Sequence, residues 1–281
     1  NDMSVALKCR LALYADDSAL IASGPNSEMV ANFLSEQLSQ CKAWLVDNRL
    51  SLHIGKTECI LFGSSRRLNG ANFLVKCGDV IVKRVLSVKY LGVIIDQSLN
   101  FREHALSIIK KATGKLYFLY RCKASLDGAS RRLLCSALIN SGLEYCCSAW
   151  YVSVLEEFKG DLAILQRKLV RFILSMGPRE HVGDCEITSL GWLQFSKRVD
   201  YFKLMHVFKV KKCLAPSYIC QNFRLVLQAH TYQIRQSNCC FPPKSFKRSA
   251  ICLWNSLPSD LKAVDGYKVF KKRLIGFLRN D

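Results

Sequence analysis

The sequence lacks a long apolar run, although half of its 281 residues are hydrophobic. No segment reaches the roughly 18 uninterrupted apolar residues that a membrane-spanning helix needs, so we expect no membrane partner. It also lacks the basic stretch followed by an apolar segment that marks a secretory signal. We therefore expect an intracellular protein, nuclear or cytoplasmic, that is not secreted.

The fourteen cysteines lack the spacing of a metal or disulfide framework. No Cys-x-x-Cys occurs, and the adjacent pairs at 146–147 and 239–240 do not suit disulfide bonding. Without a sign of secretion, reduced and mostly buried thiols are expected. A zinc site is a weak alternative, because the gaps between its ligands match no common zinc pattern. Those ligands would be Cys213, Cys220, His230 and Cys239.

Acidic residues are scarce. The chain has 22 of them against 41 lysines and arginines, a net charge of +19. The imbalance lies in residues 101–281, where 30 basic residues face 13 acidic ones, while residues 1–100 hold 11 and 9. Such a charge indicates a polyanionic partner, with a basic surface kept for solubility as the alternative.

A pair of acids near the start is the most informative feature. The sequence Tyr14-Ala15-Asp16-Asp17 stands between the apolar runs 11–13 and 19–22. Asp is depleted in strands and favoured in turns, which predicts a β-hairpin with an acidic tip. Carboxylates are ligands that Mg²⁺ prefers. The alternative is a polar turn whose acids face water.

Two further blocks follow in the first hundred residues. The first is WLVDNRLSLH at 44–53, followed by GKTE at 55–58 and CILF at 59–62. The second is VKYLGVIID at 88–96. In this order, the acidic hairpin and the two blocks resemble the reverse transcriptases of non-LTR (LINE-type) retrotransposons, in the Jockey-like group. Weaker similarity continues at 165–168, 171–174, 214–218, 253–258 and 270–274.

The resemblance implies an RNA-directed DNA polymerase, a nucleotidyltransferase that uses Mg²⁺ and no small-molecule cofactor. Its partners would be an RNA template, a DNA primer and deoxynucleoside triphosphates. Asp16 would be a direct metal ligand with Asp17 beside it, and Lys56 would donate a proton to the leaving pyrophosphate. Primer and template would contact Tyr14, Ala15, Tyr90, Leu91 and Gly92, and a thumb carrying Lys110, Lys111, Lys115, Arg121, Lys123, Arg131 and Arg132.

Simpler interpretations stay open for several of these residues. Lys56 could be an ordinary surface lysine, and Gly92 could be a strand glycine at a bulge. His53 stands where many relatives have Asn. The tryptophans at 150, 192 and 254 are better explained as core residues than as platforms for bases.

The sequence also predicts that this chain cannot polymerise DNA alone. Only thirteen residues precede Tyr14, and the chain starts at Asn1 rather than Met, as expected of a C-terminal fragment. The family needs an upstream Asp and a fingers region, and both are missing. A non-catalytic nucleic-acid-binding module and a decayed retrotransposon relic are the alternatives.

The periodicity predicts an α+β fold. Residues 27–48 should form an amphipathic helix, with strands at 52–62 and 86–95 and a hairpin at 73–82 that turns at 76–79. The helix has its apolar positions at Val30, Phe33, Leu34, Leu38, Cys41 and Leu45. A helix on a small antiparallel sheet is a partial polymerase palm, which the resemblance assigns to residues 1–97.

The rest of the chain should be helical. An apolar stripe from Ala105 to Leu119 predicts one helix, and Asp127-Gly128 should start another over 129–141, with a third through Trp150. The resemblance makes residues 98–152 a thumb and residues 153–281 a basic helical extension. In the extension we expect helices at 156–175, 197–212 and 266–279, and a polar, proline-containing stretch at 228–247.

Overall fold

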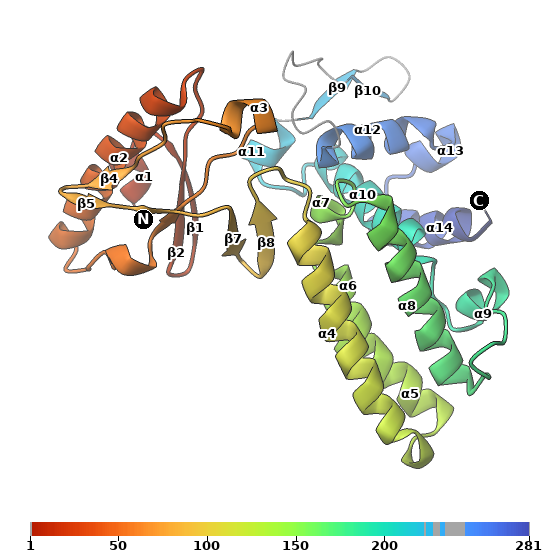
Figure 1. The fold of residues 1–281 in the computed structure, drawn as a ribbon. Helices are drawn as coiled ribbons and strands as arrows, with labels where there is room; N and C mark the ends of the chain where they lie inside the picture. Colours follow the sequence, from red (N-terminus) through yellow and green to blue (C-terminus); the bar gives the residue numbers. More distant parts are fainter. Residues whose placement is uncertain (1, 222, 227–230, 234–244, 281) are drawn as a thin grey trace. The chain divides into compact units, whose positions relative to one another are not determined.

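The computed structural model describes residues 2–221, 223–226, 231–233 and 245–280. The chain forms two units, Asn1–Leu99 and Asn100–Asp281 (Figure 1). The first combines helices with short strands and the second is dominated by helices. The α+β class is therefore confirmed. Among the described residues, no helix is both long and apolar enough to cross a membrane.

The first unit begins with the short helix α1 (Met3–Ala6) and the expected hairpin. Strands β1 (Arg10–Tyr14) and β2 (Asp17–Ile21) pair antiparallel, with Tyr14 opposite Asp17. The two-residue turn between them is Ala15-Asp16, and Ala15 has a left-handed φ of 51°. A positive φ at the first turn residue matches the right-handed twist of the strands.

Helix α2 (Ser27–Asp47) follows, as predicted. Asn26 caps it by accepting a hydrogen bond from the Glu28 backbone N–H at 2.8 Å, so Pro25 lies before the cap rather than at the first helical position. The helix buries Ala31, Leu38 and Cys41 and also the polar Gln37, which is 0% exposed.

The remaining strands are shorter than predicted. The strand expected at 52–62 has only two residues, because a 3₁₀ turn, η1 (Ile54–Lys56), occupies its first part. The hairpin at 73–82 exists, but its turn is the pair Gly78-Asp79, with Gly78 at φ 63°. These elements are β3 (Glu58–Cys59), α3 (Ser65–Leu68), β4 (Lys76–Cys77), β5 (Val80–Ile81) and β6 (Lys83–Arg84).

The prediction of a single strand at 86–95 is wrong. Strands β7 (Ser87–Tyr90) and β8 (Val93–Asp96) form an antiparallel hairpin instead. Leu91 and Gly92 have φ values of 45° and 84°, which reverse the chain. The expected single sheet is also absent from the described residues, where every sheet has two strands and the β3–β6 pair is parallel.

Helix α2 contributes to two apolar clusters of this unit. Ala31 and Leu38 pack with Phe73, Val75 and Val82 from the later segments. A second cluster surrounds Cys41 of the same helix. It contains Met3 and Leu7, with Leu11, Leu20, Trp44 and Leu45 packed against it. Thus α2 is the common support of the β1–β2 hairpin and of the segments that follow.

The second unit starts with helix α4 (Arg102–Arg121), which packs against α8 and buries the predicted stripe from Ala105 to Leu119. The helix expected at 129–141 is confirmed but changes type along its length, with a π-helical turn in the middle. Its cap, Asp127, accepts a hydrogen bond from the Ser130 backbone N–H at 2.8 Å. Its parts are α5 (Gly128–Leu134), η3 (Cys135–Asn140) and α6 (Ser141–Glu144). The short η2 (Lys123–Ser125) precedes it, and α7 (Cys147–Trp150) is a separate helix after it.

The three helices expected near the end are confirmed as α8 (Glu156–Leu174), α10 (Phe195–Lys211) and α14 (Tyr267–Asn280). Shorter elements were missed, and most of the 228–247 stretch lies outside the described residues. The missed elements are α9 (Asp184–Ser189), α11 (Ser217–Cys220), β9 (Arg224–Val226), β10 (Thr231–Gln233), α12 (Phe246–Ser256) and α13 (Ser259–Lys262).

The prediction that Trp150, Trp192 and Trp254 are core residues is confirmed for two of the three. Trp150 and Trp254 are fully buried, whereas Trp192 is partly exposed. Trp254 lies in the cluster of α10, α12 and α14, where the Phe208 and Phe270 rings stack at 4.2 Å between centroids. These helices therefore form a well-packed core at the end of the chain.

Candidate active site

The tip of the β1–β2 hairpin presents the two predicted acids. Asp16 lies in the turn and Asp17 is the first residue of β2. Both are exposed, and the neighbouring Tyr14 is 66% exposed. Among the described residues, no hydrogen bond or ion pair occupies either carboxylate. Their oxygens are available to a ligand from outside the chain.

The hairpin is tied to α2 by one buried polar side chain. The Gln37 Oε1 atom accepts hydrogen bonds from the backbone N–H groups of Lys8, at 2.6 Å, and Cys9, at 3.2 Å. These amides lead directly into β1, so Gln37 sets where the first strand begins. Gln37 was not among the residues predicted from the sequence. The available signal was a glutamine at helical spacing from the apolar Leu34 and Cys41.

The donor atoms at the tip fit part of a magnesium site. Mg²⁺ is usually held by one or two carboxylates, with substrate phosphates and water completing its octahedral shell. Asp16 and Asp17 can supply the carboxylates. The described part of the chain contains no group of three or more His, Cys, Asp or Glu residues able to hold a metal.

Lys56 lies on a different segment. It is the exposed last residue of η1, and Ile54 of the same turn packs against the apolar cluster on α2. The Thr57 hydroxyl donates to the His53 carbonyl at 3.1 Å, which closes this turn. No hydrogen bond or ion pair of the described residues joins Lys56 to the acidic tip. Its proton-donor role stays a prediction.

Tyr90, Leu91 and Gly92 lie together at the tip of the β7–β8 hairpin. Gly92 is exposed, and its left-handed backbone belongs to the turn rather than to a β-bulge. The alternative of a strand glycine at a bulge is therefore wrong. An exposed glycine at a hairpin tip allows another backbone to approach closely.

Six of the seven predicted thumb cations divide into two kinds, and Lys123 belongs to neither. Lys115 donates from Nζ to the Leu138 carbonyl at 2.7 Å, within the π-helical turn. Arg131 donates from Nε to the Leu126 carbonyl at 2.9 Å, and its other arm reaches carbonyls at the C-terminal end of α8. These two side chains stabilise the unit internally. Lys123 lies 5.9 Å from the centre of the Tyr120 ring.

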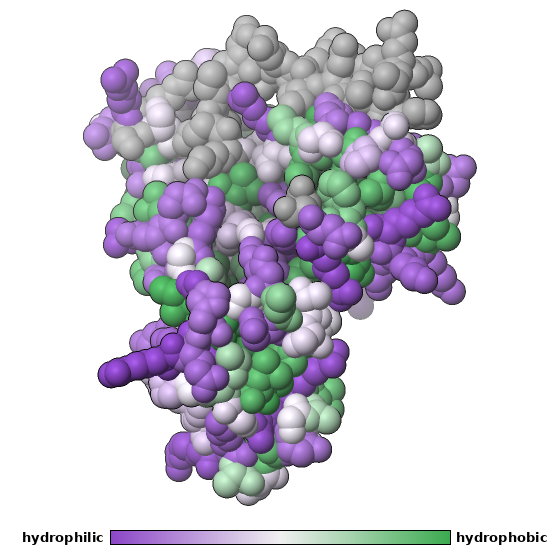
Figure 2. All heavy atoms as spheres, turned by 90° about the vertical axis from the view of Figure 1, so that its right-hand side faces the viewer, coloured by the Kyte–Doolittle hydropathy of each residue, from purple (hydrophilic) through white to green (hydrophobic). Residues whose placement is uncertain are grey.

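The other kind is directed to solvent. Lys110, Lys111, Arg121 and Arg132 are exposed. Near them on α4, Tyr117 and Phe118 are 65% and 60% exposed. On the face drawn in Figure 2, hydrophobic residues reach the surface between hydrophilic ones. Cations mixed with exposed rings suit nucleic acid, which offers phosphates and flat bases.

The zinc alternative gains no support. His230 and Cys239 lie outside the described residues. Cys213 is exposed, and the Cys220 thiol lies 3.3 Å from the Ala215 carbonyl. The twelve cysteines that the structure describes are all free thiols.

The chain is similar to several curated proteins of mobile elements. No family model matches the chain. A retrovirus-related Pol polyprotein from the type-1 retrotransposable element R1 2 of Nasonia vitripennis is 26% identical over 209 residues, covering 72% of this chain and 50% of that protein. The RNA-directed DNA polymerase from mobile element jockey of Drosophila funebris is 28% identical over 173 residues, covering 58% of the chain and 18% of that protein.

A probable RNA-directed DNA polymerase from transposon X-element of Drosophila melanogaster is 23% identical over 175 residues, covering 61% of the chain. The match spans 19% of that protein, so the chain covers half or less of each of these relatives. All three belong to mobile elements. The chain is a homologue of the R1, jockey and X-element RNA-directed DNA polymerases of non-LTR retrotransposons.

Proposed function

We propose that this chain is part of an RNA-directed DNA polymerase whose metal-binding carboxylates are Asp16 and Asp17. The observation that carries the proposal is the β1–β2 tip, where both acids are exposed and unpaired among the described residues. The substrates would be an RNA template, a DNA primer and deoxynucleoside triphosphates, and the reaction would take place inside the cell. The relatives' names support the same activity.

In this proposal the first unit is a partial palm, and the helices of residues 98–152 are a thumb. Bound Mg²⁺ would activate the primer hydroxyl and neutralise charge on the triphosphate. Asp16 and Asp17 would hold it, while Tyr14 and Ala15 lie beside the primer end. Lys56 would protonate the departing pyrophosphate. The β7–β8 tip and the exposed α4 cations would position the primer–template duplex.

In this proposal the 281 residues alone do not extend a primer. The tip brings only two adjacent carboxylates, and no further acid joins them among the described residues. Two-metal catalysis clamps both the attacking and the leaving oxygen, which needs a larger ligand set. The further ligands would come from outside the described residues.

Paramagnetic broadening by Mn²⁺ tests the metal assignment directly. In the presence of a primer–template duplex, Mn²⁺ should broaden the amide resonances of residues 13–18 before others. Asp16→Asn and Asp17→Asn should each abolish this broadening. Asp47→Asn is the matched control, because Asp47 is an exposed acid at the end of α2. Equal broadening in all variants would refute the assignment.

A second candidate function is a non-catalytic nucleic-acid-binding module. The observation that favours it is the net charge of +17 carried by residues 101–281. Such a module would bind the duplex equally well with Asp16→Asn and Asp17→Asn. Its affinity would still fall steeply with salt, because phosphate binding releases counterions.

A further inference from the structure

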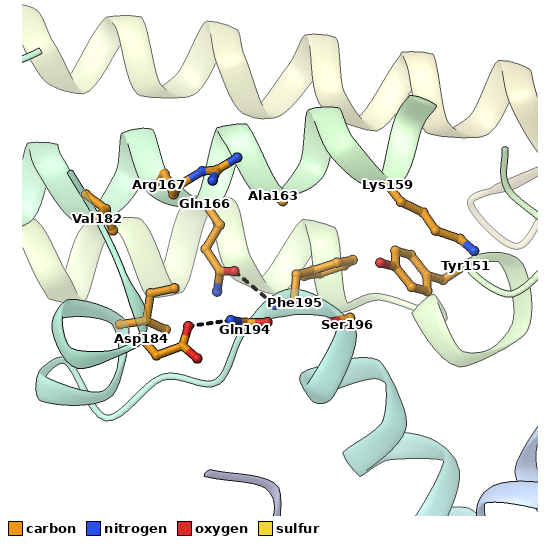
Figure 3. Close-up of a pocket in the computed structure, with 11 residues that line it drawn as sticks. Tyr151, Lys159, Ala163, Gln166, Arg167, Val182, Asp184, Gln194, Phe195 and Ser196 are labelled. Atoms are coloured by element: carbon orange, nitrogen blue, oxygen red, sulfur yellow. Dashed lines mark hydrogen bonds between the residues drawn. The ribbon is translucent and has the colours of Figure 1, made fainter. Parts of the chain in front are cut away.

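The second unit contains a pocket that the proposed polymerase chemistry does not use. It has a volume of about 260 Å³ and lies between α8, α9 and the start of α10 (Figure 3). Pockets for drug-sized ligands measure about 300–1,000 Å³, so this one suits a smaller group. All of its lining residues belong to the second unit.

One wall is a face of α8 with a cation at each end. Lys159, Ala163 and Arg167 follow one another at four-residue spacing, so they lie on the same side of the helix. The rise of a helix separates the two cations by about 12 Å along its axis. Ala163, with its short side chain, leaves the space between them open.

Both cations can bind a ligand. Arg167 is exposed and forms no hydrogen bond or ion pair with the described residues. Lys159 pairs with Glu156 at 2.7 Å, but that glutamate side chain is 77% exposed, so the pair is weak. The pocket therefore offers positive charge at two points to anything seated over Ala163.

Two aromatic rings also line the pocket, and the Lys159 Nζ atom lies 5.5 Å from the centre of the Tyr151 ring. The rings of Tyr151 and Phe195 meet edge to face, with 5.4 Å between their centroids. The Tyr151 hydroxyl points towards Phe195 (Figure 3), and no described residue forms a hydrogen bond with it. Burial raises the pKa of Tyr151 to about 12, so the hydroxyl is a donor at neutral pH.

The floor is fixed in place by two glutamines. Gln166 of α8 donates to the Leu193 carbonyl at 2.7 Å and accepts from the Phe195 backbone N–H at 2.9 Å. Gln194 donates to the Asp184 carboxylate. These bonds hold Phe195 against α8 and leave the second Asp184 oxygen able to accept from a ligand. The pocket is thus a formed cavity with two cations, two rings, a free donor and an acceptor.

We propose that this pocket binds one unstacked nucleotide of a single-stranded nucleic acid. Its base would lie against Phe195 and Tyr151, and its two flanking phosphates would contact Lys159 and Arg167. Single strands are recognised in this way, by aromatic stacking of splayed bases inside a positively charged groove. The proposal rests on the cavity itself and does not require the hairpin acids to be catalytic.

The test is binding of a fluorescein-labelled 12-nucleotide single-stranded RNA to the full chain, without Mg²⁺ or triphosphates. Ala163→Leu fills the pocket at an exposed position without changing charge, and it should weaken binding about tenfold. Ala149→Leu, at an exposed alanine of α7 outside the pocket, should leave binding unchanged. Affinity for a blunt RNA–DNA duplex should be the same in both variants.

A second pair of variants tests the phosphate contacts. Arg167→Gln should weaken binding more than Lys168→Gln, which removes the same charge from a neighbouring exposed position outside the pocket. The double variant Ala163→Leu/Arg167→Gln should lose less than the product of the two single effects, because both remove the same site. Deletion of one phosphate contact should lower the salt slope by about 0.7.

Three results would overturn the proposal. The first is single-strand affinity within twofold of wild type for Ala163→Leu. The second is equal loss for Arg167→Gln and Lys168→Gln. The third is full competition by a free nucleoside monophosphate at the oligonucleotide's own concentration, which would make this a site for free nucleotides. None of these results depends on primer extension, so failure of the polymerase proposal would be seen separately.

Discussion

Replacement of Gln37 by methionine should loosen the start of the β1–β2 hairpin. Gln37 is fully buried, and its Oε1 atom accepts the backbone N–H groups of Lys8 and Cys9. Methionine has a similar volume but is a poor acceptor, so the two amides lose their partner. An amide left unpaired in a partly buried site costs about 1–3 kcal/mol. For the pair we expect a loss of about 2–4 kcal/mol.

Amide hydrogen exchange measures this loss where it occurs. If opening of residues 7–14 becomes easier by about 2–4 kcal/mol, their exchange should accelerate about 30- to 700-fold. Gln40→Met is the matched control, since Gln40 is only partly buried and its side chain hydrogen-bonds to the side chains of Gln37 and Glu36. It should change exchange less than about fivefold. Unchanged protection of Lys8 and Cys9 in folded Gln37→Met would refute the reasoning.

Three further predictions concern other parts of the chain. Arg131→Met should lower the melting temperature of the second unit by about 5–10 °C, because the guanidinium joins α5 to the end of α8. Arg132→Met, at an exposed position, should shift it by less than about 2 °C. Equal shifts would contradict the hydrogen bonds of Arg131. Leu91→Gly should raise the urea midpoint of the first unit. Leu91 has a left-handed φ of 45°, and glycine removes its strain, which is worth about 0.5–1 kcal/mol of stability. A lower midpoint would contradict this turn. Burial, with Lys111 nearby, lowers the pKa of His104 below 6.5. The folded state then binds fewer protons than the unfolded state, so the second unit should lose stability as the pH falls below about 6.5. A stability that is flat between about pH 7 and 5, or the same pH dependence of stability in His104→Gln, would exclude this cause.

The sequence predicted the features that depend on local pattern. The acidic turn between two apolar runs predicted the β1–β2 hairpin, and three- and four-residue spacing predicted α2, α4, α8, α10 and α14. Each of these elements buries a face that is visible in its own residues. The acids of the candidate site were found for the same reason, since their carboxylates stand on a turn that the local sequence specifies.

The features that were missed depend on partners far along the chain. The β3–β6 pair joins residues about 25 positions apart, and its two-residue strands carry no period of their own. The β7–β8 turn places Leu91 at positive φ, where a bulky residue is rarely found. The sequence of residues 86–95 therefore predicted one continuous strand instead of a hairpin. Gln37 and Arg131 are polar residues whose hydrogen-bond partners are known only once the chain is folded.

The measurement that tests the central claim most directly is primer extension on an RNA template with Mg²⁺, with binding to the same duplex followed across a salt series. The account predicts no extension by the chain alone and duplex binding that weakens steeply as salt rises. Extension by the chain alone that Asp16→Asn abolishes would contradict the claim that the hairpin acids need further ligands. Absence of duplex binding at low salt would contradict the nucleic-acid function itself.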